Sequence, residues 1–254
     1  MVCLGLKLAD IRKHTNPAEA LYKDGFSHRF IIKTYLHIMS DNDKPWKPIR
    51  VAVLIYEGAE VLDYAGPFEV FYTAGRMSVR AGQYKPVFSP SLFGEIKGPI
   101  ETRPGFTVSA TCDFDSLPKP DVLIVPGGDH EPQLTNTKLL QKMRSLYAEG
   151  CLIASVCTGA FIVAESGLLN GKECTTHHED AAGLQQRYPK IRVIPDKRIV
   201  AAACGRIFTS AGISAGIDLS LELVSRLADE TLARETARNM AYRWEEINKD
   251  HHRK

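Results

Sequence analysis

The sequence lacks the features that mark several large classes of protein. No apolar run approaches the roughly 20 residues that a helix needs to span a bilayer. Charge of neither sign dominates, because 32 basic and 30 acidic side chains leave a formal net charge of +2. This balance argues against a protein that binds nucleic acid and against one that binds an anionic membrane surface.

Cysteine is present but sparse, with six residues scattered along 254 and no CxxC pair. A disulfide framework is usually dense and belongs to a short secreted chain. Residues 1–49 contain no long apolar segment, so a secretory signal is not expected. We therefore expect reduced thiols and a cytoplasmic location.

The composition, with 44% hydrophobic and 24% charged residues, is that of an ordinary globular protein. The segment SDNDKPWKP at 40–48 is polar and contains proline, as linkers often do. We expect an N-terminal extension and linker over residues 1–49 and a main domain over 50–229. A C-terminal helix and charged tail are expected over 230–254.

From residue 50 onward, short apolar runs alternate with helical patterns. Near-continuous apolar runs are typical of strands buried on both faces of a parallel sheet. Such strands are expected at 50–56, 84–91, 121–128 and 151–156. A hairpin is expected over 98–114, and short strands turning at Pro195-Asp196 over 192–212. Pro67 is expected to begin the first helix, and further helices are expected over 137–150, after Cys157 and near the C-terminus.

This alternation predicts an α/β fold with a doubly wound, mainly parallel sheet. In such folds ligands bind beyond the carboxyl ends of the strands. Asp63 is expected in the loop after the first strand, and Gly127 and Gly128 end the third. Cys157 ends the fourth strand, directly before a helix.

Two interpretations of Cys157 are open from its position. A sharp strand-to-helix turn would present its sulfur as a nucleophile, and the helix N-terminus would favour the thiolate. The N–H groups of Thr158 and Gly159 would then donate to a bound anion. The alternative is a buried structural cysteine, which suits Cys151, Cys174 and Cys204 better.

The neighbouring candidates also have two interpretations each. Gly127 and Gly128 either form only a tight turn or offer backbone N–H groups to an oxyanion. Asp63 is either a solvated acid or, if it faces Cys157, a general acid or base.

The segment CTTHHED at 174–180 raises the question of a metal site. Adjacent side chains on a strand point to opposite faces, which is poor geometry for one ion. No metal is expected there. His177 is interpreted as a polar residue of the pocket or as a surface histidine.

Four motifs between about Arg50 and Asp229 resemble the ThiJ/PfpI superfamily, which is related to class I glutamine amidotransferase domains. They are VLDYAGPFEVF, DVLIVPGG, SVCTGAFIVAESGLLNGKECTTHH and TSAGISAGIDLSLELV, in that order. The resemblance implies a flavodoxin-like, three-layer fold with a nucleophile elbow, often assembled as a homodimer. It also implies that Cys157 is the reactive cysteine and that Asp63 is the acid beside it.

The residue after the cysteine indicates which branch of the ThiJ/PfpI superfamily the chain resembles. PfpI-type proteases and glyoxalases typically place histidine there, whereas this chain has Thr158. VLDYAGP together with SVCTGA resembles isonitrile hydratases and the sensor half of some AraC-type regulators. The hydratase resemblance implies that Cys157 attacks the isonitrile carbon and Asp63 moves a proton. Thr158 would orient the site, and N–H groups near Gly128 and Thr158 would hold intermediates, with no metal or organic cofactor.

Two other functions stay open. One is a glyoxalase- or deglycase-like enzyme that uses Cys157, Asp63 and His177 on reactive carbonyls. The other is a non-enzymatic sensor of a ligand or of oxidation. Since only about 25 residues follow Asp229, a DNA-binding domain of the AraC type is not expected after the sheet. The expected partner is a small molecule.

Overall fold

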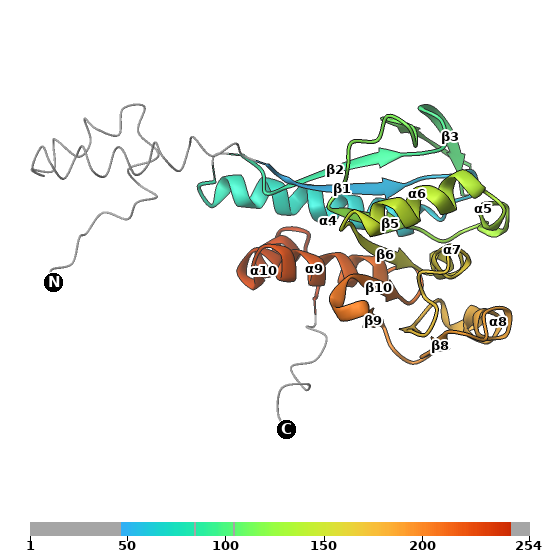
Figure 1. Cartoon of the computed structure of the whole chain (residues 1–254). Coiled ribbons are helices and arrows are strands. Elements are labelled where there is room, and N and C mark those ends of the chain that lie inside the picture. The colour runs from blue at the N-terminus through green and yellow to red at the C-terminus, as the bar shows by residue number, and fades with distance from the viewer. Residues whose placement is uncertain (1–46, 84, 104, 245–254) are drawn as a thin grey trace, which may run out of the picture.

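The structure, a computed structural model, describes residues 47–83, 85–103 and 105–244 (Figure 1). The expected N-terminal extension therefore lies almost wholly outside the described residues. No helix in the described ranges is both long and apolar enough to cross a membrane.

The centre of the fold is a six-stranded sheet with the order β2-β1-β5-β6-β10-β9. Neighbouring strands are parallel except for β9 and β10, as the mainly parallel prediction requires. In register, Val53 lies beside Ile124, and Ile124 lies beside Ala154. The strands are β1 Ile49–Leu54, β2 Phe88–Phe93, β5 Val122–Val125, β6 Leu152–Val156, β9 Ile199–Ala202 and β10 Ile207–Ser210.

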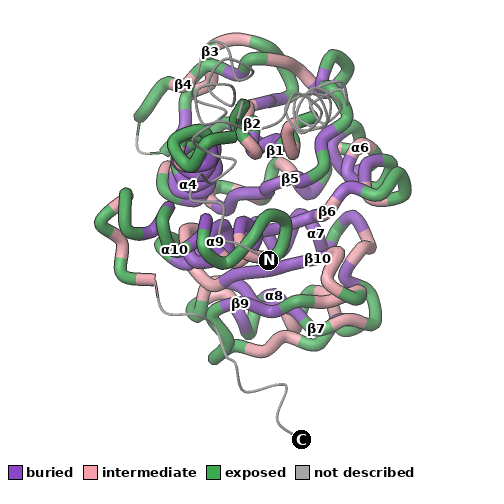
Figure 2. The backbone as a smooth tube through the Cα atoms, turned by 90° about the vertical axis from the view of Figure 1, so that its left-hand side faces the viewer, coloured by how far each residue is buried: buried purple, intermediate pink, exposed green. Residues whose placement is uncertain are grey.

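Helices cover both faces of this sheet, which gives the three layers of the flavodoxin-like fold. One layer holds α4 (Val61–Arg80), α9 (Ala215–Leu227) and α10 (Glu230–Asn239), which pack on one another. The other layer holds α6 (Thr137–Ala148) and α7 (Gly159–Glu165). Figure 2 shows the central strands β5, β6 and β10 buried over most of their length, whereas the edge strands β2 and β9 are partly exposed. Burial on both faces explains why the central strands have nearly continuous apolar sequences.

Smaller elements complete the fold. The predicted hairpin is confirmed as β3 (Gly98–Thr102) paired antiparallel with β4 (Phe106–Ala110). The expected turn at Pro195-Asp196 does not join two paired strands. It separates β8 (Arg192–Val193), which pairs with β7 (Glu173–Cys174), from β9 of the main sheet. Two short helices, α5 (Glu131–Leu134) and α8 (Ala181–Arg187), lie near the site described below.

Several expected boundaries were wrong, and two of these errors affect the description of the site. The second strand begins at Phe88 rather than at residue 84. The first helix begins at Val61, so Pro67 lies inside it. Proline has no N–H, and in a helix that group would bond the carbonyl four residues earlier, which here is Asp63. Asp63 therefore lies in the first turn of α4 and not in a loop.

Candidate active site

The candidate residues lie at one edge of the sheet, where three parallel strands end. Because β1, β5 and β6 are neighbours, the segments that follow them meet at their carboxyl ends. Tyr56 follows β1, Gly127 and Gly128 follow β5, and Cys157 follows β6. Asp63 reaches the same edge from the first turn of α4. The predicted site residues are thus brought together by the topology rather than by sequence proximity.

Cys157 has the strained backbone of a nucleophile elbow. It lies between β6 and Thr158, and its φ is 56°, a left-handed conformation that is uncommon for cysteine. Its N–H is shared between the carbonyls of Ser210 and Ala211, both at 3.2 Å. Its carbonyl accepts the Thr176 hydroxyl at 2.8 Å. Such strain persists only where surrounding bonds hold it, and it is concentrated at functional sites.

The elbow is built around a glycine that no other residue can replace easily. A Cβ atom on Gly159, the first residue of α7, would lie 2.2 Å from the carbonyl oxygen of Val125. This close approach lets the helix start against β5 directly after the elbow.

The elbow does not expose the sulfur, and the predicted thiolate is not favoured. Cys157 is only 8% exposed, and burial, with a further contribution from Asp63, raises the pKa of its thiol to about 12. The N–H groups of Thr158 and Ile213 act in the opposite direction and lower that pKa. Desolvation therefore raises the pKa of Cys157 more than the N-terminus of α7 lowers it. The resting group is therefore a thiol, and a nucleophilic role would require it to lose its proton.

Asp63 is suited to take that proton. Its side chain is fully buried, and Oδ2 accepts the Gly127 N–H at 2.9 Å. Burial raises the pKa of Asp63 to about 7, although the Gly127 N–H and the Cys157 thiol lower it. The second oxygen, Oδ1, is buried and has no hydrogen-bond partner within the described ranges. A carboxyl group with a pKa near neutrality can act as both acid and base.

This pKa predicts a pH-dependent cost in stability. Because the pKa of Asp63 rises from 3.8 to about 7 on folding, the unfolded chain loses this proton before the folded chain does. The cost is absent below pH 4, grows as the pH rises, and is complete above pH 7. Asp63→Asn should therefore raise the free energy of unfolding at pH 8 by up to roughly 4 kcal/mol and leave it nearly unchanged at pH 4. Urea unfolding at both pH values measures this, and an equal change at both would contradict it.

Gly127 and Gly128 do not form an open oxyanion hole, which corrects one of the two interpretations above. The Gly127 N–H donates to Asp63, and the Gly128 N–H donates to the Thr158 hydroxyl at 3.0 Å. A Cβ atom on Gly127 would lie 2.6 Å from Thr158 Oγ1 and 2.9 Å from Asp63 Oδ2. The glycines therefore hold the two site side chains in place.

His177 lies at the border of the site. A Cβ atom on Gly212 would lie 2.0 Å from the His177 ring, so the ring covers this glycine, which follows Ala211 in the loop after β10. Its Nδ1 is 3.5 Å from Asp180 and 3.9 Å from Glu179. These contacts place His177 beside the loop whose Ala211 carbonyl accepts the Cys157 N–H, with the polar edge of the ring directed at two acids.

Sequence reasoning missed two residues that contact the site. Tyr56 donates its hydroxyl to the Pro126 carbonyl at 3.0 Å, and burial, Asp63 and Cys157 together raise its pKa. Thr176 holds the Cys157 carbonyl, as noted above. The signal for Tyr56 was its place as the last residue of the RVAVLIY run, where a strand reaches the ligand edge. Thr176 had no comparable signal.

The other cysteines differ in burial. Cys151 and Cys174 are buried, as the structural interpretation expects, but Cys204 is exposed and its φ is 55°. The expectation of burial was wrong for Cys204, because it lies in a turn between β9 and β10. Across the described ranges, no group of three or more His, Cys, Asp or Glu side chains could hold a metal ion.

Comparison with known proteins agrees with this fold. Residues 49–226 match the DJ-1/PfpI family over most of the described chain. The chain belongs to the DJ-1/PfpI family. A ThiJ/PfpI family protein from Pseudomonas syringae has the same fold, with a TM-score of 0.67 and 26% identity over 83% of each chain.

Relatives within the DJ-1/PfpI family differ in function. Isonitrile hydratase of Pseudomonas putida is 30% identical over 180 residues, which are 70% of this chain and 72% of that protein. The HTH-type transcriptional regulator CdhR of Pseudomonas aeruginosa is also 30% identical over 180 residues, but these are only 51% of the regulator. Deglycase PH1704 of Pyrococcus horikoshii is 31% identical over 84 residues, 32% of this chain and 51% of that protein. Family membership thus includes both enzymes and regulators.

Proposed function

We propose that the protein is a cysteine-dependent hydratase that converts an isonitrile and water into an N-substituted formamide. The observation that carries the proposal is the buried pair of Cys157 and Asp63, with Thr158 instead of a histidine after the cysteine. The similarity to isonitrile hydratase supports the same assignment. We also infer a homodimer, which the membership of the DJ-1/PfpI family supports. We infer a reducing compartment because the described cysteines are all free.

In the first step, the Cys157 sulfur attacks the terminal carbon of the isonitrile. Its proton passes to Asp63 Oδ1, which has no hydrogen-bond partner among the described residues, and from there to the same carbon. The product is a thioimidate, in which one new C–S bond and one new C–H bond have formed. The N–H groups of Thr158 and Ile213 stabilise the sulfur while it carries charge.

In the second step, water displaces the Cys157 sulfur from the thioimidate carbon. Asp63, now a carboxylate, accepts a proton from water as the oxygen attacks the thioimidate carbon. The nitrogen gains a proton, the C–S bond breaks, and Cys157 recovers its proton. The overall reaction adds one water to one isonitrile with no change in oxidation state of the protein, so the residues present suffice.

The surface beside the site favours a substrate with an apolar substituent. Ile213 is 41% exposed, and its N–H is directed at the Cys157 sulfur. Large apolar side chains exposed beside a buried reactive group are suited to an apolar substituent on the ligand. We therefore expect alkyl isonitriles to be better substrates than charged ones.

The test is turnover of cyclohexyl isocyanide, followed as N-cyclohexylformamide by mass spectrometry. Methylglyoxal is assayed in parallel, with lactate as its product. Formamide production supports the hydratase, whereas lactate alone would assign the glyoxalase-like activity.

A ligand sensor is the second candidate, favoured by the match to the regulator CdhR over 71% of this chain. Absence of both products, together with a shift in melting temperature on adding the isonitrile, would assign that role. Direct oxidation sensing is less well supported, because oxidation follows thiolate character and the pKa of Cys157 is about 12.

A further inference from the structure

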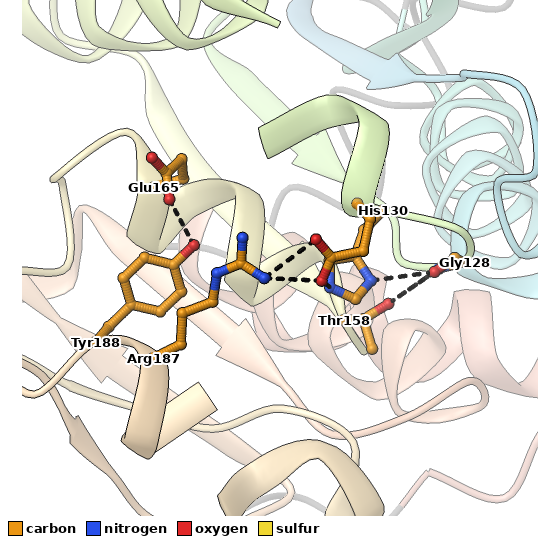
Figure 3. Close-up of polar contacts among 7 residues, drawn as sticks. Gly128, His130, Thr158, Glu165, Arg187 and Tyr188 are labelled. Atoms are coloured by element: carbon orange, nitrogen blue, oxygen red, sulfur yellow. Dashed lines mark hydrogen bonds and ion pairs between the residues drawn. The ribbon is translucent and has the colours of Figure 1, made fainter. Parts of the chain in front are cut away.

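His130 lies behind the candidate active site, two residues after Gly128. Its side chain is only 12% exposed, and its ring packs on Phe161 of α7 with the ring centroids 4.5 Å apart. Figure 3 shows the ring between the Gly128 loop and the helix that follows the elbow. His130 is therefore a fixed part of the site's support and not a mobile surface histidine.

The ring of His130 contacts the Gly128 carbonyl, which also accepts a hydrogen bond from the Thr158 hydroxyl. The Gly128 carbonyl accepts the His130 backbone N–H at 2.8 Å, and the His130 Nδ1 lies 3.2 Å from it. It also accepts the Thr158 hydroxyl at 3.3 Å, while the Gly128 N–H donates to that hydroxyl at 3.0 Å. A carbonyl can only accept, so this geometry assigns the ring proton to Nδ1.

The surroundings of the Nε2 atom argue against a purely structural role for His130. His130 Nε2 is buried and has no hydrogen-bond partner among the described residues, with Glu131 Oε1 3.7 Å away. The Glu131 carboxylate is held by Arg187 of α8 through two bonds of 2.8 and 3.1 Å. An unpaired buried nitrogen is unfavourable, and phenylalanine or leucine would avoid it. What histidine adds at this position is the Nδ1 donor.

We propose that His130 is a positioning residue whose Nδ1–H fixes the Gly128 peptide and, through it, the Thr158 hydroxyl beside Cys157. Gly127, in the same loop, donates to Asp63, so a rotation of the Gly128 peptide would disturb both the Thr158 hydroxyl and the Asp63 carboxyl group, which influences the sulfur. The expected effect on turnover rests on the proposed function. The effect on the chemical reactivity of Cys157 does not.

The test compares two substitutions that separate the donor from the ring. His130→Phe keeps a ring on Phe161 and loses the donor. His130→Asn loses the ring, but its amide nitrogen occupies the position of Nδ1. Carbamidomethylation of Cys157 by iodoacetamide, followed on the peptide that contains it, reports thiol reactivity without any substrate. Tyr188→Phe is the control, because it removes a neighbouring bond to Glu165 of 2.7 Å without touching Gly128.

In the phenylalanine variant, the alkylation rate at pH 8 is expected to fall about fivefold, the effect of losing one hydrogen bond. The asparagine variant and the Tyr188 control should stay within about twofold of the unaltered protein. If isonitrile turnover is present, kcat should fall in the phenylalanine variant with KM unchanged.

Equal losses in the phenylalanine and asparagine variants would overturn the proposal, since ring volume rather than the donor would then matter. An unchanged alkylation profile in the phenylalanine variant would overturn it as well. If that variant does not fold, His130→Leu, which also lacks a donor, takes its place. Altered alkylation without any formamide production would refute the hydratase and leave the role of His130 standing.

Discussion

Replacing Cys157 with alanine is expected to reduce formamide production at least a thousandfold while leaving the fold intact. The reason is that every covalent step of the proposed mechanism passes through this sulfur, and removing a nucleophile typically costs several orders of magnitude. Alanine also fits the elbow, because it retains the Cβ atom and loses only the sulfur. Steady-state rates with cyclohexyl isocyanide, together with the circular dichroism spectrum and melting temperature, measure both halves of this prediction.

Cys151→Ala and Cys174→Ala are matched controls for that experiment. Burial raises the pKa of each thiol to about 12, as it does for Cys157, but neither is influenced by Asp63. Both variants should retain activity within a few-fold, provided that they fold. Substantial turnover in Cys157→Ala, or equal losses in all three variants, would contradict the assigned nucleophile.

The second large effect is expected at Gly128. A Cβ atom there would lie 2.3 Å from the Gly58 carbonyl oxygen and 2.5 Å from the Glu60 nitrogen, and φ is +119°. Both contacts are with backbone, which cannot move aside as the end of a flexible side chain can. Gly128→Ala should therefore lower the free energy of unfolding by more than about 3 kcal/mol. Urea unfolding at a single pH provides the measurement.

Gly98 offers the control for backbone strain alone. Its φ is +123°, almost the same as at Gly128, but a Cβ atom would meet no heavy atom within 4 Å. Gly98→Ala is therefore expected to cost only about 1 to 2 kcal/mol. Similar losses in the two variants would show that conformation, and not the close approach of the Gly128 loop to residues 58–60, requires glycine here.

The framework of the fold was predictable because it depends on local patterns. A strand that is buried on both faces must be apolar throughout, so β1, β5 and β6 stood out in the sequence. A cysteine between such a strand and a helical pattern has few conformations available, which made the elbow at Cys157 predictable. Asp63 was a candidate from its place after the first strand, but no pattern in the sequence links it to the cysteine, and only the resemblance paired the two.

The chemistry of the site was less predictable because it depends on three-dimensional burial. The helix N-terminus favours a thiolate, but only the packed structure reveals how strongly desolvation opposes it at Cys157. Pro67 suggested a helix start, whereas α4 tolerates it in its second turn and so carries Asp63 inside the helix. The N–H groups of Gly127 and Gly128 were expected to face a ligand, yet side chains from α4 and the elbow already accept them.

The most direct test of the account is the covalent state of Cys157 during turnover. The protein is mixed with cyclohexyl isocyanide, quenched in acid within the first turnovers, and the peptide that contains Cys157 is weighed by mass spectrometry. The account predicts a thioimidate adduct whose added mass equals that of one isonitrile, on Cys157 and on no other cysteine. Formamide production with no adduct at Cys157, and with undiminished rate in Cys157→Ala, would contradict it.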